Sequence, residues 1–288
     1  MNHDHGADGG QGRRVDANLA LPPMNLMYLV TESTEVEWFL ASGRRAVEDI
    51  ERMLQRNGLA IERFRHVLDF GCGCGRVMRH WAGRRGPQFY GTDIHSEAIA
   101  WCQAHLPFAR FAVNGLAPPL PYSSGRFDFV YALSVFTHLP EGLQALWLRE
   151  LRRVLQPGGY LLFTTHGAAF LPFMSLQEQQ QFRSGRLVVQ RPEVAGTNRC
   201  SVFHPLPCVG GVRQRLDGGG RDARRIKGES TPRPVPVPQT RRNARFAGIR
   251  PSTHARGVSA GPRRKRLFAS GKVFASGKVK RTPGFRAG

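Results

Sequence analysis

The sequence lacks any long hydrophobic run: no stretch of its 288 residues approaches the roughly 18 consecutive apolar residues of a membrane-spanning helix. Residues 1–14 are polar and glycine-rich and lack the apolar segment of a secretory signal. Cysteine is scarce, with five in the chain, which argues against a disulfide scaffold, and Cys72 and Cys74 are spaced too tightly for a CxxC metal site. We therefore expect a cytoplasmic protein with reduced thiols, no membrane partner and no bound metal.

Acidic residues are nearly missing from the C-terminal part of the chain, residues 205–288, which we call the tail. The tail contains 21 lysines and arginines but 3 acidic residues, whereas residues 1–204 contain 21 basic and 18 acidic residues. Nearly all of the net charge of +21 therefore belongs to the tail. The tail also lacks tryptophan and tyrosine and is rich in glycine and proline, a composition that cannot bury enough apolar surface to fold alone.

Three interpretations of the tail remain open. The basic cluster at residues 263–266 favours an arm that binds RNA or DNA, whereas the composition as a whole favours a disordered extension. The tail also repeats the hexapeptide F-A-S-G-K-V at residues 268–273 and 274–279. The abrupt change in composition at Pro205 is also what a reading-frame error in a GC-rich gene produces. In that case the regular final strands of the fold have been lost, and the last regular strand has an unprotected edge.

Residues 66–167 alternate short apolar runs with amphipathic segments, a pattern typical of an α/β protein. Strands are predicted at residues 66–70, 88–92, 110–113, 127–133 and 160–165, and helices at residues 76–82, 96–105 and 141–155. This alternation indicates a doubly wound, mostly parallel Rossmann-like sheet with helices on both faces. Ligands of such sheets bind at the carboxyl ends of the strands, so functional residues are expected directly after each strand.

A further helix is predicted before the first strand. Thr34 and Glu37 have the spacing of a capping box, and apolar residues follow at intervals of three to four positions as far as Met53. This helix either packs on the sheet or, in a sharper alternative, covers a ligand. The chain thus divides into a flexible N-terminal segment (1–30), one domain (31–204, with its core at 66–167) and the tail.

A glycine-rich loop follows the first predicted strand and reads D-F-G-C-G-C-G-R from Asp69 to Arg76. Glycines allow a sharp turn and a close approach of the backbone to a ligand, and a helix N-terminus after the loop offers N–H groups to an anionic or zwitterionic group. A dinucleotide fingerprint needs G-x-G-x-x-G, but this chain has Arg76 at the sixth position. The loop therefore favours another ligand, although tight structural turns use glycine as well.

Asp93 ends the second predicted strand, 22 residues after Gly71. A carboxylate at this place can bind the hydroxyl groups of a ribose as a charged acceptor. The alternative is that Asp93 caps the helix at residues 96–105. The spacing together with the position at a strand end favours the ribose.

The chain resembles the class I S-adenosylmethionine-dependent methyltransferases in four motifs that have the family's order and spacing, over about 100 residues. These are the glycine loop, the strand end at Asp93, the strand F-D-F-V-Y-A-L with the S-V-F-T-H-L that follows it, and L-R-R-V-L-Q-P-G-G at residues 151–159. The resemblance implies an enzyme that transfers a methyl group from S-adenosylmethionine. It also implies that the cofactor is bound by Asp69, Gly71, Cys72, Gly73, Gly75, Arg76, Asp93, Ile94, Asn114, Gly115, Leu116, Leu133 and Ser134.

Within that set, the resemblance assigns the methionine part of the cofactor to the glycine loop and the adenine to Ile94 and to the segment from Asn114 to Leu116. The family often has aspartate where this chain has Asn114, and an amide can also address an adenine edge. Asn-Gly is equally an ordinary turn, so the two interpretations weigh about the same. We interpret the small side chains of Cys72 and Cys74 as packing residues.

His138 is the candidate general base, because histidine titrates near neutrality and this one follows the fourth predicted strand. The slightly favoured alternative is that it braces the helix that starts after Pro140. His204 is a candidate acceptor-site residue, or else an ordinary loop histidine. Because residues 1–204 are nearly neutral, we expect a small-molecule acceptor. The alternatives are an RNA methyltransferase that uses the tail, and a non-catalytic protein that only binds the cofactor.

Overall fold

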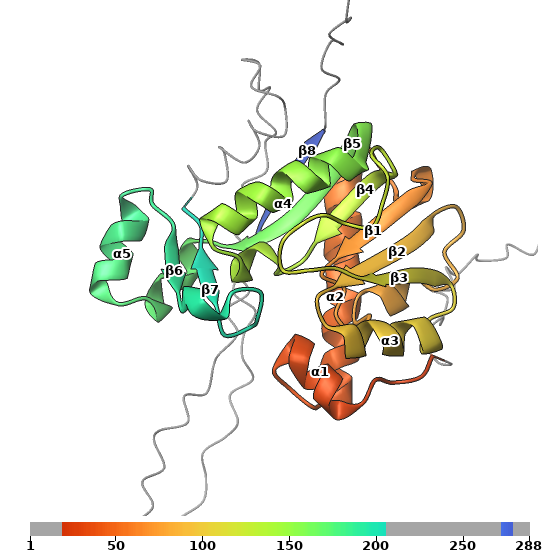
Figure 1. The fold of residues 1–288 in the computed structure, drawn as a ribbon, viewed down its shortest axis with the longest axis horizontal. Coiled ribbons are helices and arrows are strands. Elements are labelled where there is room, and N and C mark those ends of the chain that lie inside the picture. Colours follow the sequence, from red (N-terminus) through yellow and green to blue (C-terminus); the bar gives the residue numbers. More distant parts are fainter. Residues whose placement is uncertain (1–18, 206–271, 279–288) are drawn as a thin grey trace, which may run out of the picture.

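The computed structural model describes residues 19–205 and 272–278, and the remaining residues of the tail and of the N-terminus lie outside the described residues. Within these ranges the strands form one sheet in the order β3-β2-β1-β4-β5-β7-β6, with β8 paired to β5 (Figure 1). The strands are β1 His66–Phe70, β2 Gln88–Asp93, β3 Ala109–Val113, β4 Phe127–Ala132, β5 Leu155–His166, β6 Val188–Gln190, β7 Ser201–Phe203 and β8 Lys272–Lys278. The predicted Rossmann-like fold is confirmed.

The strand order reverses between β1 and β4, which are parallel neighbours although β2 and β3 lie between them in the sequence. The pairs β1–β2, β2–β3 and β4–β5 are parallel as well. The carboxyl ends of all five strands therefore lie at one edge of the sheet. In doubly wound sheets, the reversal point at that edge is where ligands bind.

Both faces of the sheet are buried under helices. The helices α2 (Val36–Arg56) and α3 (Ser96–His105) cover one face, and α4 (Glu141–Val154) covers the other. Successive side chains of a strand point to opposite faces, so Val67 packs toward α2 and α3 whereas Leu68 packs toward α4. This explains why the central strands are apolar throughout, as is typical of parallel sheets.

Two local predictions were wrong. The helix predicted at residues 76–82 is a short 3₁₀ helix, η3 (Met78–Trp81), in which the apolar Met78 and Trp81 are buried together with the charged Arg79, so that the segment has no separate polar face. The capping box at Thr34 does not form either. Helix α2 begins at Val36 with no side-chain cap, and the Ser33 hydroxyl instead accepts the Glu35 N–H at 3.1 Å.

Residues 24–31 form a helix, so the prediction of a flexible segment at residues 1–30 does not hold for residues 24–30; residues 1–18 lie outside the described residues. Helix α1 (Met24–Thr31) follows two prolines and buries Leu26 and Met27 against Phe39 of α2. The burial of these side chains stabilises a helix of eight residues that is too short to be stable in isolation. Helix α1 thereby lies next to the glycine loop, as Cys74 packs in the same apolar cluster.

The chain beyond β5 forms a small unit of α5 (Leu176–Arg183) and the antiparallel hairpin β6–β7. A capping box of Ser175 and Glu178 starts α5. The strand β7 was not predicted, because three residues between loops carry no alternation of their own. None of the helices within the described ranges is both long and apolar enough to cross a membrane.

The expected unprotected edge of β5 is not found. Strand β8 pairs antiparallel with β5 from Tyr160 to His166, and its backbone comes from the repeated hexapeptide of the tail. Residues 272–278 therefore form a regular strand, which the composition of the tail did not indicate. The hexapeptide is short, and basic and glycine-rich residues surround it. The composition of this segment therefore did not predict a strand.

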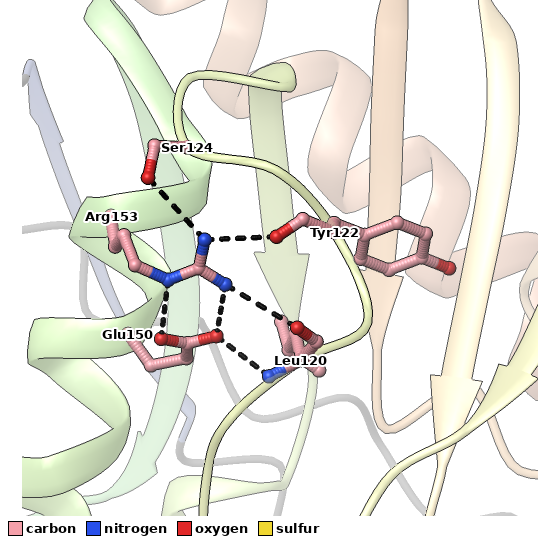
Figure 2. Close-up of polar contacts among 5 residues, drawn as sticks. All are labelled: Leu120, Tyr122, Ser124, Glu150 and Arg153. Carbon is pink, nitrogen blue, oxygen red and sulfur yellow. Dashed lines mark hydrogen bonds and ion pairs between the residues drawn. The ribbon is translucent and has the colours of Figure 1, made fainter.

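A charged clamp fixes the long loop between β3 and β4 onto α4 (Figure 2). The Arg153 guanidinium donates to the Glu150 carboxylate at 2.6 and 2.8 Å and to the Tyr122 carbonyl oxygen at 2.8 Å. One Glu150 oxygen also accepts the Leu120 N–H at 2.6 Å. These hydrogen bonds, chiefly those from Arg153, lower the pKa of Glu150. The clamp is structural and holds the loop that starts at the predicted adenine edge.

Glu150→Gln is expected to lower the free energy of unfolding at pH 7 by about 2 kcal/mol, because the variant loses charge-assisted hydrogen bonds. Since the pKa of Glu150 is lowered in the folded state, its contribution is present above the ordinary value of 4.5 and is lost as the pH falls through the folded pKa. Urea unfolding at pH 7 and pH 3 measures both effects. Glu48→Gln, at an exposed position of α2, is the control and should change little.

Candidate cofactor site

The predicted cofactor residues gather at the carboxyl ends of β1, β2, β3 and β4, although they come from four separate segments of the chain. The glycine loop follows β1, Asp93 ends β2, Asn114 follows β3 and Ser134 follows β4. The parallel pairing of the strands brings these segments to one edge of the sheet. The fold therefore brings together the segments that the sequence singled out.

The glycine loop has a backbone that other residues rarely adopt. Gly71, Gly73 and Gly75 all have positive φ, at 80°, 54° and 76°. A Cβ atom at each position would lie 2.3–2.4 Å from a side chain, that of Val135, Val30 and Leu106 respectively. Glycine is required here both for the backbone conformation and for the close packing around it.

Backbone hydrogen bonds tie the loop to the end of β2. The N–H groups of Gly71 and Cys72 both donate to the Thr92 carbonyl oxygen, at 2.7 and 2.9 Å. The Gly73 N–H donates to Asp93 Oδ2 at 2.8 Å. The Cys72 side chain is buried next to Cys102, so Cys72 faces the site only through its backbone. The loop is thus held in shape before any ligand arrives.

Asp93 is half-buried, and each carboxylate oxygen accepts one backbone N–H, from Gly73 at 2.8 Å and from His95 at 3.0 Å. The alternative, that Asp93 caps α3, is only partly met. Asp93 accepts the N–H of His95, the residue just before α3, but no side chain caps an N–H group of the helix itself. A carboxylate oxygen has a second lone pair, so both oxygens of Asp93 can still accept from a ribose hydroxyl. The side chain fits the predicted role and also braces the loop.

The predicted adenine edge contains an unsatisfied acceptor. Asn114 is buried, and its amide nitrogen donates to the Gly115 carbonyl oxygen at 2.8 Å, whereas Oδ1 has no hydrogen-bond partner among the described residues. A buried amide oxygen without a partner is costly, and an adenine amino group is the kind of donor it lacks. Ile94 and the exposed Leu116 flank this position, each with its Cδ1 atom close to Gly196.

Asp69 lies under the loop in a polar cluster of the core. Its carboxyl shares a hydrogen bond with the Tyr131 hydroxyl, which also accepts the Trp81 indole N–H at 3.0 Å, and Oδ2 has no partner within the part of the chain that the structure describes. Burial raises the pKa of Asp69 to about 7, although Tyr131 and the nearby Arg76 lower it. Arg76 is half-buried and donates to the Ser42 hydroxyl at 3.3 Å. Asp69 and Arg76 thus support the glycine loop from the side of the protein core.

The raised pKa of Asp69 predicts a pH-dependent stability. The folded protein holds a proton that the unfolded chain has released, so this contribution is complete below about pH 4 and is lost as the pH rises through 7. His204 acts in the opposite direction, because burial lowers its pKa to about 4. The quantity to measure is therefore the free energy of unfolding of Asp69→Asn relative to that of the wild type, by urea unfolding. We expect this difference to rise by up to about 4 kcal/mol between pH 4 and pH 7, so that the variant becomes the more stable of the two as the pH rises.

Parallel slopes for Asp69→Asn and the wild type between pH 4 and pH 7 would contradict the assignment. Asparagine keeps the size of the side chain and can still accept from the Tyr131 hydroxyl, so the variant changes the charge and little else.

The segment after β4 contains the remaining predicted residues. Ser134 has a positive φ of 60°, and its N–H donates to the Thr164 hydroxyl at 2.7 Å, whereas Leu133 packs on the core. His138 is half-buried in the 3₁₀ helix that follows, η4 (Phe136–His138), and its Nδ1 lies 2.7 Å from the Cys200 carbonyl oxygen. A carbonyl only accepts, so Nδ1 donates the hydrogen, and in the neutral ring Nε2 carries the lone pair.

The surroundings of His204 do not favour its predicted place in the acceptor site. It is 3% exposed, and Nε2 lies 2.9 Å from the amide nitrogen and 3.2 Å from the amide oxygen of Gln144 in α4. An acceptor could reach this ring only after β7 and α4 had separated. The sequence could not indicate this, because the pairing joins residues 60 positions apart.

The residues present fit S-adenosylmethionine. A glycine loop supplies a close approach for the methionine part, Asp93 offers acceptors to a ribose, and the unsatisfied Oδ1 of Asn114 suits an adenine amino group. These features at the reversal point of a doubly wound sheet define a nucleoside-binding Rossmann-like domain. Residues 68–163 match the family model described as a methyltransferase domain. They form a class I methyltransferase domain, and S-adenosylmethionine is its cofactor.

Known methyltransferases are among the proteins that this chain is similar to. The chain is 32% identical over 114 residues to the malonyl-[acyl-carrier protein] O-methyltransferase of Enterobacter lignolyticus, covering 40% of this chain and 44% of that protein. It is 29% identical over 138 residues to the ubiquinone biosynthesis O-methyltransferase of Paracidovorax citrulli, covering 44% and 56%. A SAM-dependent methyltransferase structure from Methanosarcina mazei overlaps at a TM-score of 0.41 and 23% identity, over 52% of this chain and 77% of that one. The chain spans about half the length of the curated relatives it matches.

The sequence missed two segments at the site, α1 and the loop between β6 and β7. Val30 of α1 covers Gly73, and Gly196 of the loop lies against Leu116. The signal for the loop was present as Gly-Thr-Asn at residues 196–198, but glycine in a turn does not indicate what the turn touches.

Proposed function

We propose that this protein transfers a methyl group from S-adenosylmethionine to an oxygen atom of a small-molecule acceptor. The observation that carries the proposal is the joint placement of the glycine loop, Asp93 and Asn114 at the reversal point of the sheet. The named activities of the two curated relatives, both O-methyltransferases, support oxygen as the acceptor atom. The near-neutral charge of residues 1–204 supports a small molecule rather than nucleic acid.

The bound cofactor supplies a methyl group on a sulfonium, which an aligned nucleophile can accept directly. The domain's own task is to hold the donor in place and to bring the acceptor oxygen into line with it, because alignment supplies most of the rate enhancement of such a transfer. The rigid glycine loop, braced by Thr92 and Asp93, serves the first part of this task.

His138 takes the proton of the acceptor hydroxyl in this proposal. Its Nδ1–H is held by the Cys200 carbonyl oxygen, so Nε2 has the lone pair of a base. The neighbouring His166, whose ring centroid lies 6.4 Å from that of His138, packs on Phe170 with the ring centroids 4.1 Å apart and the ring planes tilted by 34°. This aromatic wall suits an apolar, ring-shaped acceptor beside the base.

Incubation of the full chain with S-adenosylmethionine labelled in the methyl group tests the proposed function. The acceptors are a panel of phenols and fatty acids, with transfer RNA as the competing class. We expect label in the phenol fraction, because a phenol has the hydroxyl proton that His138 would take, whereas a fatty acid is already ionised at neutral pH. Label in RNA alone would contradict the small-molecule acceptor, and no transfer to any of them despite tight cofactor binding would favour a non-catalytic protein.

His138→Asn is expected to lower the turnover of the accepted substrate roughly 30-fold, below the usual range for a lost base because the sulfonium reacts readily once aligned. The affinity for S-adenosylhomocysteine should remain within about twofold of the wild type. Steady-state rates between pH 6 and pH 9 with calorimetry on the same samples measure both quantities. An unchanged rate would show that the alternative, a bracing histidine, is correct.

A further inference from the structure

Residues 194–200, which we call the strap, bracket His138 from two sides. The Gly196 N–H donates to the His138 carbonyl oxygen at 2.8 Å, and the Cys200 carbonyl oxygen accepts from the His138 ring at 2.7 Å. The strap therefore fixes both the backbone and the ring of the candidate base. It belongs to the unit after β5, which the family match at residues 68–163 does not include.

The same strap lies against the predicted adenine edge. Gly196 has a positive φ of 80°, and a Cβ atom there would lie 2.6 Å from Leu116 Cδ1 and 3.3 Å from Ile94 Cδ1. Only glycine allows the backbone to approach these two side chains so closely. The strap thus covers the residues that flank the adenine.

Asn198 joins the strap to α1. Its side-chain amide donates to the Leu29 carbonyl oxygen, which belongs to a residue 169 positions earlier in the chain. The next residue, Val30, is the one that rests on Gly73 of the glycine loop. The same helix also accepts a weak hydrogen bond from the Cys74 thiol at the Leu26 carbonyl oxygen, at 3.3 Å. Figure 1 shows α1 and the β6–β7 loop on the same side of the sheet.

We propose that Asn198 is a positioning residue that holds α1 down on the glycine loop, so that the strap and α1 together retain the bound cofactor. The inference rests on the proposed function, because it takes the loop to be the cofactor site. The inference links two roles of the strap. The strap orients the His138 ring, and through Asn198 it also holds α1 over the bound cofactor.

The hydrogen bond from Asn198 acts on the cofactor through Val30 rather than by touching it. When the bond is lost, α1 keeps its apolar packing through Leu26 and Met27. The helix therefore remains folded but is held less firmly on Gly73. We expect faster release of the cofactor product, with a smaller effect on its association.

The test is calorimetry and stopped-flow dissociation of S-adenosylhomocysteine with the full chain. Asn198→Ala is expected to weaken the affinity about fivefold, the equivalent of one hydrogen bond of about 1 kcal/mol. Asn198→Asp keeps the size but removes the N–H donor, so it should show the same loss. The matched control is Asn25→Ala, which removes another amide hydrogen bond of α1, the one to Glu97 at 3.1 Å, without touching the strap.

The outcomes separate the inference from the proposed function. An affinity of Asn198→Ala within twofold of the wild type, or an equal loss in Asn25→Ala, overturns the inference and leaves the proposed function intact. A wild type that does not bind S-adenosylhomocysteine overturns both. If Asn198→Ala does not fold, amide hydrogen exchange of the wild type with and without S-adenosylhomocysteine tests the inference. We expect the ligand to slow exchange both in α1 and in the strap. Slower exchange in only one of these two segments would contradict the inference.

Discussion

Asp93→Ala is expected to weaken the binding of S-adenosylhomocysteine about 1000-fold, the equivalent of about 4 kcal/mol for two charge-assisted hydrogen bonds. The substitution removes the acceptors for the ribose hydroxyls. It also removes the brace on the Gly73 N–H, which now holds the glycine loop at 2.8 Å. Both losses act on the cofactor, and calorimetric titration of the purified full chain measures the sum.

A matched control exists at the opposite edge of the sheet. Asp128 also accepts two backbone N–H groups, those of Arg65 at 2.7 Å and His66 at 2.9 Å, but at the amino end of β1. Asp128→Ala should therefore lower the free energy of unfolding while the affinity for S-adenosylhomocysteine stays within about twofold. If both variants lose affinity equally, Asp93 acts only through the stability of the domain and the ribose assignment is wrong.

Gly73→Ala is expected to weaken the binding of the same ligand several-hundred-fold. At a φ of 54° an alanine pays roughly 1–2 kcal/mol of backbone strain. Its Cβ atom would also lie 2.3 Å from Val30 Cγ1, so that either the loop or α1 must move. The displacement would break the hydrogen bond to Asp93, and the loop and the ribose acceptor would lose their alignment together.

Gly58→Ala is the control for the strain alone. Gly58 has a similar φ of 68°, but no atom lies within 4 Å of the position of a Cβ atom there. This variant should lose about 1 kcal/mol of stability and bind S-adenosylhomocysteine as the wild type does. Wild-type affinity in Gly73→Ala, measured by calorimetry beside this control, would show that the loop does not approach the cofactor.

The sequence was sufficient for the five parallel strands β1 to β5 and for the grouping of residues at the centre of the candidate site. Strands β1 and β2 and helices α3 and α4 were predicted within one residue at each end, because their apolar periodicity and their turn residues agree. Asp69 and the glycines lie at the end of β1 and in the loop after it, and Asp93 ends the next strand, β2, so their spacing is fixed by two consecutive parallel strands.

Other parts of the site depend on contacts between distant segments, which no local pattern records. The burial of His204 follows from its pairing with Gln144, and the place of α1 follows from the packing of Leu26 and Met27. The strap is a short irregular segment, so its role depends on the backbone of Gly196 and on one amide of Asn198. For such segments the sequence indicates a turn, and only the folded chain determines what the turn touches.

The central claim is that the glycine loop, Asp93 and Asn114 form one site for S-adenosylmethionine. The most direct test is calorimetric titration of the wild-type full chain with S-adenosylhomocysteine at pH 7. We expect saturable binding of one molecule per chain, with the affinity lost in Asp93→Ala and kept in Asp128→Ala. Absence of saturable binding by a folded wild type would contradict the account.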